Sequence, residues 1–180
     1  MKKSTTLLLS IFLLITANVG FSQHDQKLDE RNPQAMMKAT FLFQFAKQSN
    51  WIESVSSESF IIAVYGNTDV YNHLSEKYAT QPIGNQTLKI IEIKSIAQLS
   101  EASIVFIDKS KMKDFNAIKQ HFHNQNTMLV TETKGALKKG SMINFLLIDS
   151  ELKIEINNKE AQIKKISIGI LLIKWAINNN

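Results

Sequence analysis

The sequence has no cysteine, only two prolines and six glycines, and four histidines among 180 residues. The missing cysteine excludes a disulfide framework, a thiolate metal site and thiol redox chemistry. The chain also has no GxSxG turn, which positions a serine nucleophile, and no HExxH pattern, which binds a catalytic metal. Hydrophobic residues make up 44% of the chain, so its stability must come from a hydrophobic core. We therefore expect one domain without catalytic residues, cofactor or metal.

Long apolar runs are also missing, apart from residues 7–15 near the N-terminus. This run follows two lysines and precedes small residues at the positions before Gln23, a pattern that predicts a signal peptide over residues 1–22 and a polar leader over residues 23–32. The alternative is an uncleaved membrane anchor, but the run is well short of the ~20 residues that span a bilayer. We therefore expect a periplasmic protein that does not span the membrane.

The net charge is modest, and the chain contains many residues of both signs. The formal net charge is +5, and removal of Lys2 and Lys3 with the signal peptide lowers it to +3. The remaining lysines are spread along the sequence instead of forming one block, which is a weak argument for nucleic acid or an acidic membrane as partner. No nucleic-acid partner is expected.

The domain is predicted to begin with a helix after Asn32, with Pro33 at the first helical position. Its apolar residues cover more than one face, which indicates burial between a sheet and another layer. Phe41, Phe45 and Trp51 are interpreted as core anchors. The alternative is an aromatic box for a ligand.

Four short runs rich in β-branched and aromatic residues then alternate with helical patterns at 69–78, 95–99 and 113–123. This alternation predicts an α/β fold, a three-layer α/β/α sandwich with a mostly parallel sheet, in a single domain over residues 33–177. The predicted parallel strands are residues 60–65, 88–93, 102–107 and 127–130.

The C-terminal part changes the topology. Residues 144–148 and 152–156 are separated by too few residues for a crossover, so they predict an antiparallel hairpin within 143–156. Asn157 and Asn158 begin a predicted closing helix, whose isoleucines form one apolar stripe while its lysines face water. The stripe is Ile163, Ile166, Ile170 and Ile173, and the lysines are Lys164, Lys165 and Lys174. This stripe could pack against the core or form a surface for a partner, and the sequence leaves both roles open.

Candidate ligand residues follow the predicted strands. Gly66 and Asn67 come directly after the first parallel strand, Asp108 after the third and Thr131 after the fourth. The carboxyl ends of parallel strands are the usual ligand-binding edge of an open α/β sheet. A strand, a glycine turn and a helix can also hold a phosphate, with Asn67 or Thr68 as the helix cap, but one glycine is not a nucleotide motif.

The histidines offer no metal site by their spacing. His121 and His123 are two residues apart, so on a helix they point in different directions. They are interpreted as surface residues.

Six segments in this order resemble the YfiR-like family of periplasmic regulators, over residues 33–176. They are KATFLFQFAKQSNWIE (38–53), FIIAVYGN (60–67), ASIVFID (102–108), MLVTET (128–133), GSMINFLLIDSELKIEIN (140–157) and ISIGILLIKWA (166–176). The family often ends its first helix with an aromatic residue, Trp and Pro. Here the corresponding residues are Asn50, Trp51 and Ile52, so the Trp is present and the Pro is absent. The shape of the loop that follows is therefore not implied by the resemblance.

The resemblance implies an exported, non-enzymatic α/β protein. Such a protein binds the periplasmic sensor part of a membrane signalling enzyme, a diguanylate cyclase or histidine kinase, and thereby restrains cyclic-di-GMP signalling or biofilm formation. Characterised members use cysteine pairs as a redox switch, which this cysteine-free chain cannot do. Partner-binding or structural roles are assigned to Phe41, Phe45, Trp51, Asn144 and Asn157. Asn157 is expected to cap the helix that follows it.

Two points stay open from the sequence. The alternative function is a periplasmic small-molecule-binding module with its ligand at the carboxyl ends of the strands. The oligomeric state is also open: if the protein forms a homodimer, the Phe-rich first helix and the Ile-rich last helix are the expected interface.

Overall fold

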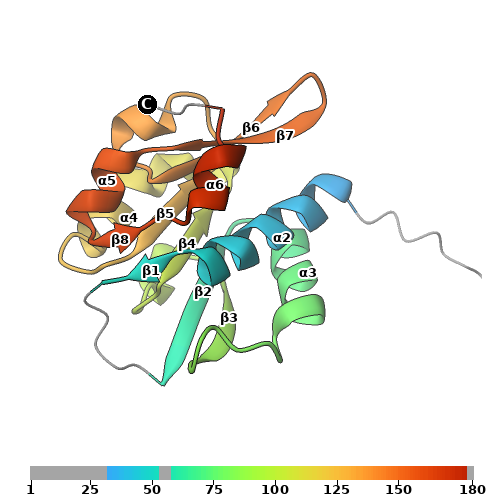
Figure 1. Cartoon of the computed structure of the whole chain (residues 1–180), viewed down its shortest axis with the longest axis vertical. Coiled ribbons are helices and arrows are strands. Elements are labelled where there is room, and N and C mark those ends of the chain that lie inside the picture. The colour runs from blue at the N-terminus through green and yellow to red at the C-terminus, as the bar shows by residue number, and fades with distance from the viewer. Residues whose placement is uncertain (1–31, 53–57, 178–180) are drawn as a thin grey trace, which may run out of the picture. The chain divides into compact units, whose positions relative to one another are not determined.

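The computed structural model describes residues 32–52 and 58–177, and the domain is built on a six-stranded sheet (Figure 1). The strand order is β3-β2-β4-β5-β6-β7. The strands are β2 (Ser59–Tyr65), β3 (Thr87–Ile93), β4 (Ile104–Ile107), β5 (Met128–Thr131), β6 (Ile143–Ile148) and β7 (Glu151–Ile156). The predicted signal peptide and nearly all of the polar leader lie outside the described residues.

The strands from β3 to β6 run parallel, and β7 alone is antiparallel. In β2, β4 and β5 nearly every residue is buried, as expected for a sheet covered on both faces. The hairpin turns through Asp149 and Ser150, whose φ angles are 48° and 65°, so the turn is of the type that matches strand twist. The predicted α/β class, parallel sheet and C-terminal hairpin are confirmed.

One face of the sheet is covered by α2 (Pro33–Gln48), α3 (Thr68–Tyr78) and α6 (Ile170–Trp175). As predicted, α2 begins at Asn32, whose side chain accepts a hydrogen bond from the Ala35 N–H, with Pro33 at the first position. The α3 cap is Asn67, not Thr68. The helices α2 and α3 pack through Phe43 and Tyr78, whose rings stack at 4.2 Å.

The opposite face is covered by the 3-10 helix η3 (Lys109–Asp114) and by α4 (Phe115–His121). Phe115, Ile118 and Phe122 form a second core there, together with the buried strand residues that point toward this face of the sheet. The predicted helix over 113–123 is therefore shorter and begins as a 3-10 turn. Two further 3-10 turns, η2 (Ile96–Gln98) and η4 (Ala136–Lys139), connect β3 to β4 and β5 to β6.

The predicted continuous closing helix is wrong. The chain forms α5 (Asn158–Ile163), then the short strand β8 (Ile166–Ser167), and then α6. Lys165 has a φ of 52° and ends the first helix. The strand β8 pairs with β1 (Asn50–Trp51), which follows α2. At Gly169 a Cβ would lie 2.0 Å from the Gln48 carbonyl oxygen, so only glycine fits this crossing.

This interruption also overturns the predicted apolar stripe. Ile163 and Ile170 are largely exposed, whereas Ile166 is buried. Lys164, predicted to face water, is buried. Within the described part of the chain, no helix is long and apolar enough to cross a membrane.

Candidate functional site

The strand order reverses between β2 and β4, and the residues that follow these two strands meet at the carboxyl edge of the sheet. The Asn67 side chain donates to the Asp108 carboxylate at 3.0 Å while its oxygen caps α3. The other Asp108 oxygen accepts from the Ser110 N–H at 2.8 Å. A crevice at such a switch point is where open α/β sheets usually bind ligands.

A buried carboxyl pair lies beside Asn67. The carboxyls of Asp108 and Glu132 hydrogen-bond each other. Burial by itself raises the pKa of Asp108, but hydrogen bonds from Glu132, Ser110 and Asn67 outweigh it and lower that pKa to about 2. Burial and the Asp108 carboxyl raise the pKa of Glu132. The contact between the two carboxyls therefore moves their pKa values in opposite directions.

Glu132 also ties helix α2 to this edge. The Lys38 ammonium forms a hydrogen-bonded ion pair with Glu132, and both side chains are almost fully buried. The Lys109 N–H donates to the other Glu132 oxygen at 3.2 Å. Both contacts oppose the rise in the pKa of Glu132. The pair therefore joins α2 to the loops after β4 and β5.

Thr131 belongs to a separate buried network around Asn144. Thr131 Oγ1 donates to Asn144 Oδ1 at 2.7 Å and lies 2.9 Å from Ser141 Oγ. Asn144 Oδ1 also accepts from the Thr133 N–H at 3.0 Å, and its amide donates to Glu155 at 2.9 Å. The hydroxyl of Thr133 is buried at this edge without a hydrogen-bond partner.

Gly66 is packed against the helical turn that follows β4. It has a φ of 91°, and a Cβ there would lie 2.4 Å from Lys111 Cγ. The Lys111 ammonium lies 5.3 Å from the centre of the Tyr65 ring. The Tyr65 hydroxyl donates to Asp114 at 2.7 Å. Burial and this hydrogen bond raise the pKa of Tyr65 to about 12.

The structure thus brings Gly66, Asn67 and Asp108 together and leaves Thr131 in the neighbouring buried network. Most of their polar atoms already bond to other groups of the chain. Sequence reasoning missed Glu132 and Lys38. Glu132 follows β5 directly, so the rule that selected Thr131 could have found it, but nothing in the local sequence marked Lys38.

The aromatic residues assigned to α2 lie in different environments. Phe45 is fully buried against Phe145, with ring centres 5.8 Å apart. Phe41 is partly buried, and the centre of its ring lies 6.1 Å from the ring centre of Trp175 on α6. Trp51 packs edge-on against Phe60, and its indole N–H donates to the Asn126 carbonyl at 2.8 Å. Phe45 is therefore a core residue, and Phe41 borders the surface.

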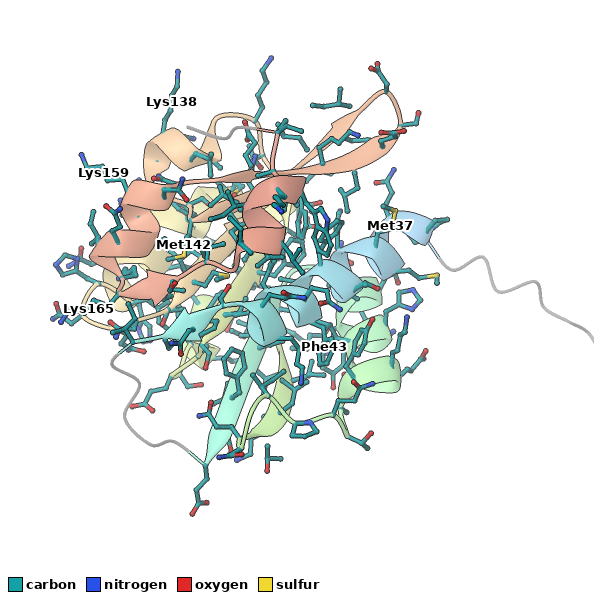
Figure 2. The ribbon with its side chains drawn as sticks, viewed as in Figure 1. Met37, Phe43, Lys138, Met142, Lys159 and Lys165 are labelled. Atoms are coloured by element: carbon teal, nitrogen blue, oxygen red, sulfur yellow. The ribbon has the colours of Figure 1, made fainter. Side chains whose placement is uncertain are left out.

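We call four exposed apolar side chains the apolar face: they lie on α2, β6 and α6, which meet at Phe41, and are Met37, Leu147, Leu171 and Trp175. Leu171 is one turn before Trp175 on α6, which packs against α2 and β7. Met37 is one turn before Phe41, and Figure 2 shows it at the outer end of α2. The exposed fractions are 44% for Met37, 54% for Leu147, 44% for Leu171 and 48% for Trp175. Side chains of this size and exposure, gathered together, are typical of an interaction surface.

A hollow of about 920 Å³ lies at the opposite, amino edge of the sheet. Its lining includes Trp51, Phe60 and Thr127, together with the buried, unpartnered hydroxyl of Ser49. Because its rim flanks residues 53–57, which lie outside the described residues, we assign no ligand to it. The described residues contain no cluster of three or more His, Asp or Glu side chains that could hold a metal, and His121 and His123 are exposed.

The comparisons with known proteins identify a family and a fold. The family model for YfiR/HmsC-like proteins matches residues 35–176. Among solved structures, the chain is similar to an ABC domain from Streptococcus pneumonia in complex with L-Trp, with a TM-score of 0.52 and 14% identity. That match covers 79% of this chain and 59% of the other, and at this identity it shows the fold alone. No curated protein matches the chain.

Proposed function

Because the chain belongs to the YfiR/HmsC-like family, we propose that it is an exported, non-enzymatic regulator that restrains a membrane signalling enzyme. The observation that carries this proposal is the family match, which spans residues 35–176 and so includes the sheet and both helix layers. The regulator would bind the periplasmic sensor part of a diguanylate cyclase, with a histidine kinase as the second choice. Cyclic-di-GMP signalling or biofilm formation would then be its output. The predicted signal peptide over residues 1–22 would deliver it to the periplasm.

We assign the partner contact to the apolar face. Its exposed side chains come from α2, α6 and the hairpin, which are held together by Phe41 packing against Phe145 and Trp175. Aromatic and methionine side chains are enriched where proteins bind one another. Trp175 and Phe41 are the expected anchors of the contact.

Restraint would follow from mass action. A regulator that binds only the inactive form of the sensor part shifts the enzyme toward that form, by no more than its difference in affinity for the two forms. Any stimulus that weakens the contact would release the enzyme. In this chain the stimulus cannot be a disulfide switch, because there is no cysteine.

The test is co-purification of envelope proteins with the tagged regulator. A Leu147→Asp, Leu171→Asp double variant places two charges in the apolar face, and we expect it to lose the membrane signalling protein that the wild type retains. Ile96→Asp is the matched control, because Ile96 is similarly exposed but lies on η2. Equal capture by the double variant, or no signalling protein captured by the wild type, would contradict the proposal. A double variant that changes from dimer to monomer instead assigns the face to a homodimer.

The alternative function is a small-molecule-binding module. The buried, unpartnered hydroxyl of Thr133 at the carboxyl edge favours it, since such a group gains a hydrogen bond from a bound ligand. A thermal-shift panel of nucleotides and amino acids, including L-Trp, tests it. A ligand that binds the folded state must raise the melting temperature, and a panel with no shift would count against this function.

A further inference from the structure

Three separate segments within residues 115–169 carry seven lysines and two histidines but only one acidic residue. The segments are residues 115–126, 134–142 and 157–169. The lysines are Lys119, Lys134, Lys138, Lys139, Lys159, Lys164 and Lys165, and the acidic residue is Glu160. No one segment has more than three lysines, which is why the sequence shows no basic block.

Hydrogen bonds join these segments into one surface. The Lys119 ammonium donates to the Lys139 carbonyl at 3.1 Å, which joins α4 to η4. The Asn157 amide donates to the Leu137 carbonyl at 3.2 Å, which joins the start of α5 to η4. The Lys164 ammonium donates to the carbonyls of residues 122, 123 and 125, which joins the end of α5 to the loop after α4. We call this surface the basic face.

The basic face is open to solvent. Lys134, Lys138, Lys139, Lys159 and Lys165 are exposed. Figure 2 shows Lys138, Lys159 and Lys165 along the same side of the molecule, with their side chains directed outward. Two lysines are not exposed: Lys119 is half-buried, and the charge of Lys164 is buried among the carbonyls that it binds. The exposed side chains of the three segments therefore carry mainly positive charge.

An apolar side chain lies among these charges. Ile163 is 62% exposed and is one turn after Lys159 on α5. Lysines around an exposed aliphatic side chain are the pattern of a surface that binds a membrane interface, where the ammonium groups meet lipid phosphates and the apolar group enters the acyl boundary. A surface for single-stranded nucleic acid usually combines such charges with aromatic side chains that stack on bases.

We propose that the basic face is a docking surface for a membrane rich in anionic phospholipid headgroups. It would hold the protein at the bilayer surface by electrostatic attraction and shallow insertion of Ile163, without a spanning segment. Binding at the bilayer would concentrate the protein near any membrane-anchored partner. The proposal goes beyond the regulatory function and does not require it. It can be tested with lipid vesicles, which contain no partner protein.

The test is co-sedimentation of the purified protein with vesicles of phosphatidylcholine alone or mixed with phosphatidylglycerol. We expect binding only to the phosphatidylglycerol vesicles, and weaker binding at high salt because exposed charges are screened. The triple variant Lys138→Gln, Lys159→Gln, Lys165→Gln should bind about 100-fold more weakly, given the attraction expected for each lysine at an anionic surface.

A matched triple variant separates the face from net charge. Lys47→Gln, Lys77→Gln, Lys89→Gln removes the same charge from exposed positions on α2, α3 and β3, and we expect its vesicle binding to be nearly unchanged. Ile163→Ala should weaken vesicle binding but not binding to soluble dextran sulfate. Equal losses in the two triple variants would overturn the proposal. Binding to dextran sulfate without binding to vesicles would assign the face to a soluble polyanion and also overturn it.

Discussion

The ammonium of Lys164 donates a 2.6 Å hydrogen bond to the backbone carbonyl of Phe122, across 42 positions of the sequence. It also donates to the carbonyls of His123 and Gln125, at 2.9 and 3.1 Å. Trp51 donates to the next carbonyl, that of Asn126. Two side chains from distant segments therefore hold the loop between α4 and β5, and burial lowers the pKa of Lys164.

Lys164→Met should destabilise the domain by about 2–4 kcal/mol, because one buried and two partly buried hydrogen bonds from a charged donor are lost. Urea unfolding measures this loss. Lys159→Met is the control, because Lys159 is exposed on the same helix, and it should change stability by less than about 0.5 kcal/mol. Equal effects of the two substitutions would show that the three hydrogen bonds add nothing to stability.

Asn157→Ala should cost about 0.5–2 kcal/mol, the usual range for loss of an N-cap. The Asn157 oxygen accepts from the Glu160 N–H at 3.1 Å, as expected for the cap of α5. Asn72→Ala, at an exposed position within α3, should be neutral or slightly stabilising. Thermal melting followed by circular dichroism checks both variants. An unchanged melting temperature for Asn157→Ala would make partner binding the better role for this residue.

Gly66→Ala and Gly84→Ala separate backbone strain from crowding. Both glycines have positive φ angles, 91° and 59°, but only at Gly66 would a Cβ meet neighbouring atoms. Gly84→Ala should cost about 1 kcal/mol through the left-handed backbone alone. Gly66→Ala should cost about 2–3 kcal/mol, because Lys111 must also move. If chemical unfolding gives the same loss for both, the contact with Lys111 is of no energetic importance.

Acid unfolding should report the Asp108 carboxylate. Its folded pKa is lowered from 3.8 to about 2, so its contribution to stability is present above about pH 4 and is lost as the pH falls toward 2. The raised pKa of Glu132 has the opposite effect on stability. Its contribution to the free energy of unfolding is present at low pH and is lost as the pH rises through the raised pKa.

Asp108→Asn should therefore flatten the fall in stability between about pH 4 and 2 relative to the wild type. Denaturant unfolding at a series of pH values measures both curves. Parallel curves in that window would mean that Asp108 does not titrate with a lowered pKa.

Local sequence patterns were enough for the strands, the caps and the hairpin. Asn32 and Asn157 cap helices as predicted, since an N-cap depends only on residues within one turn. The alternation of strands and helices was enough to predict the parallel sheet. Two parallel strands need a long crossover connection, and a helix between them provides it. The hairpin turn followed from the few residues available between its strands.

The failures concern contacts between distant segments. The isoleucine spacing in residues 163–173 predicted one helix, but pairing of β8 with β1 and the close crossing of Gly169 over Gln48 interrupt it. In the interrupted segment Lys164 is buried against the loop after α4, and Ile163 is exposed. Lys38 reaches the edge of the sheet because α2 packs across the sheet against β4, a contact that no local sequence pattern indicates.

The sequence alone therefore determined the α/β class, the candidate edge with Asn67 and Asp108, and the family, because strand runs, turn residues and motif order are local properties. Only the tertiary structure decided which lysines are buried, how the carboxyl pair Asp108–Glu132 is completed by Lys38, and which exposed lysines share one face. These depend on hydrogen bonds and packing between segments tens of residues apart, whose free energies appear only once the chain is folded.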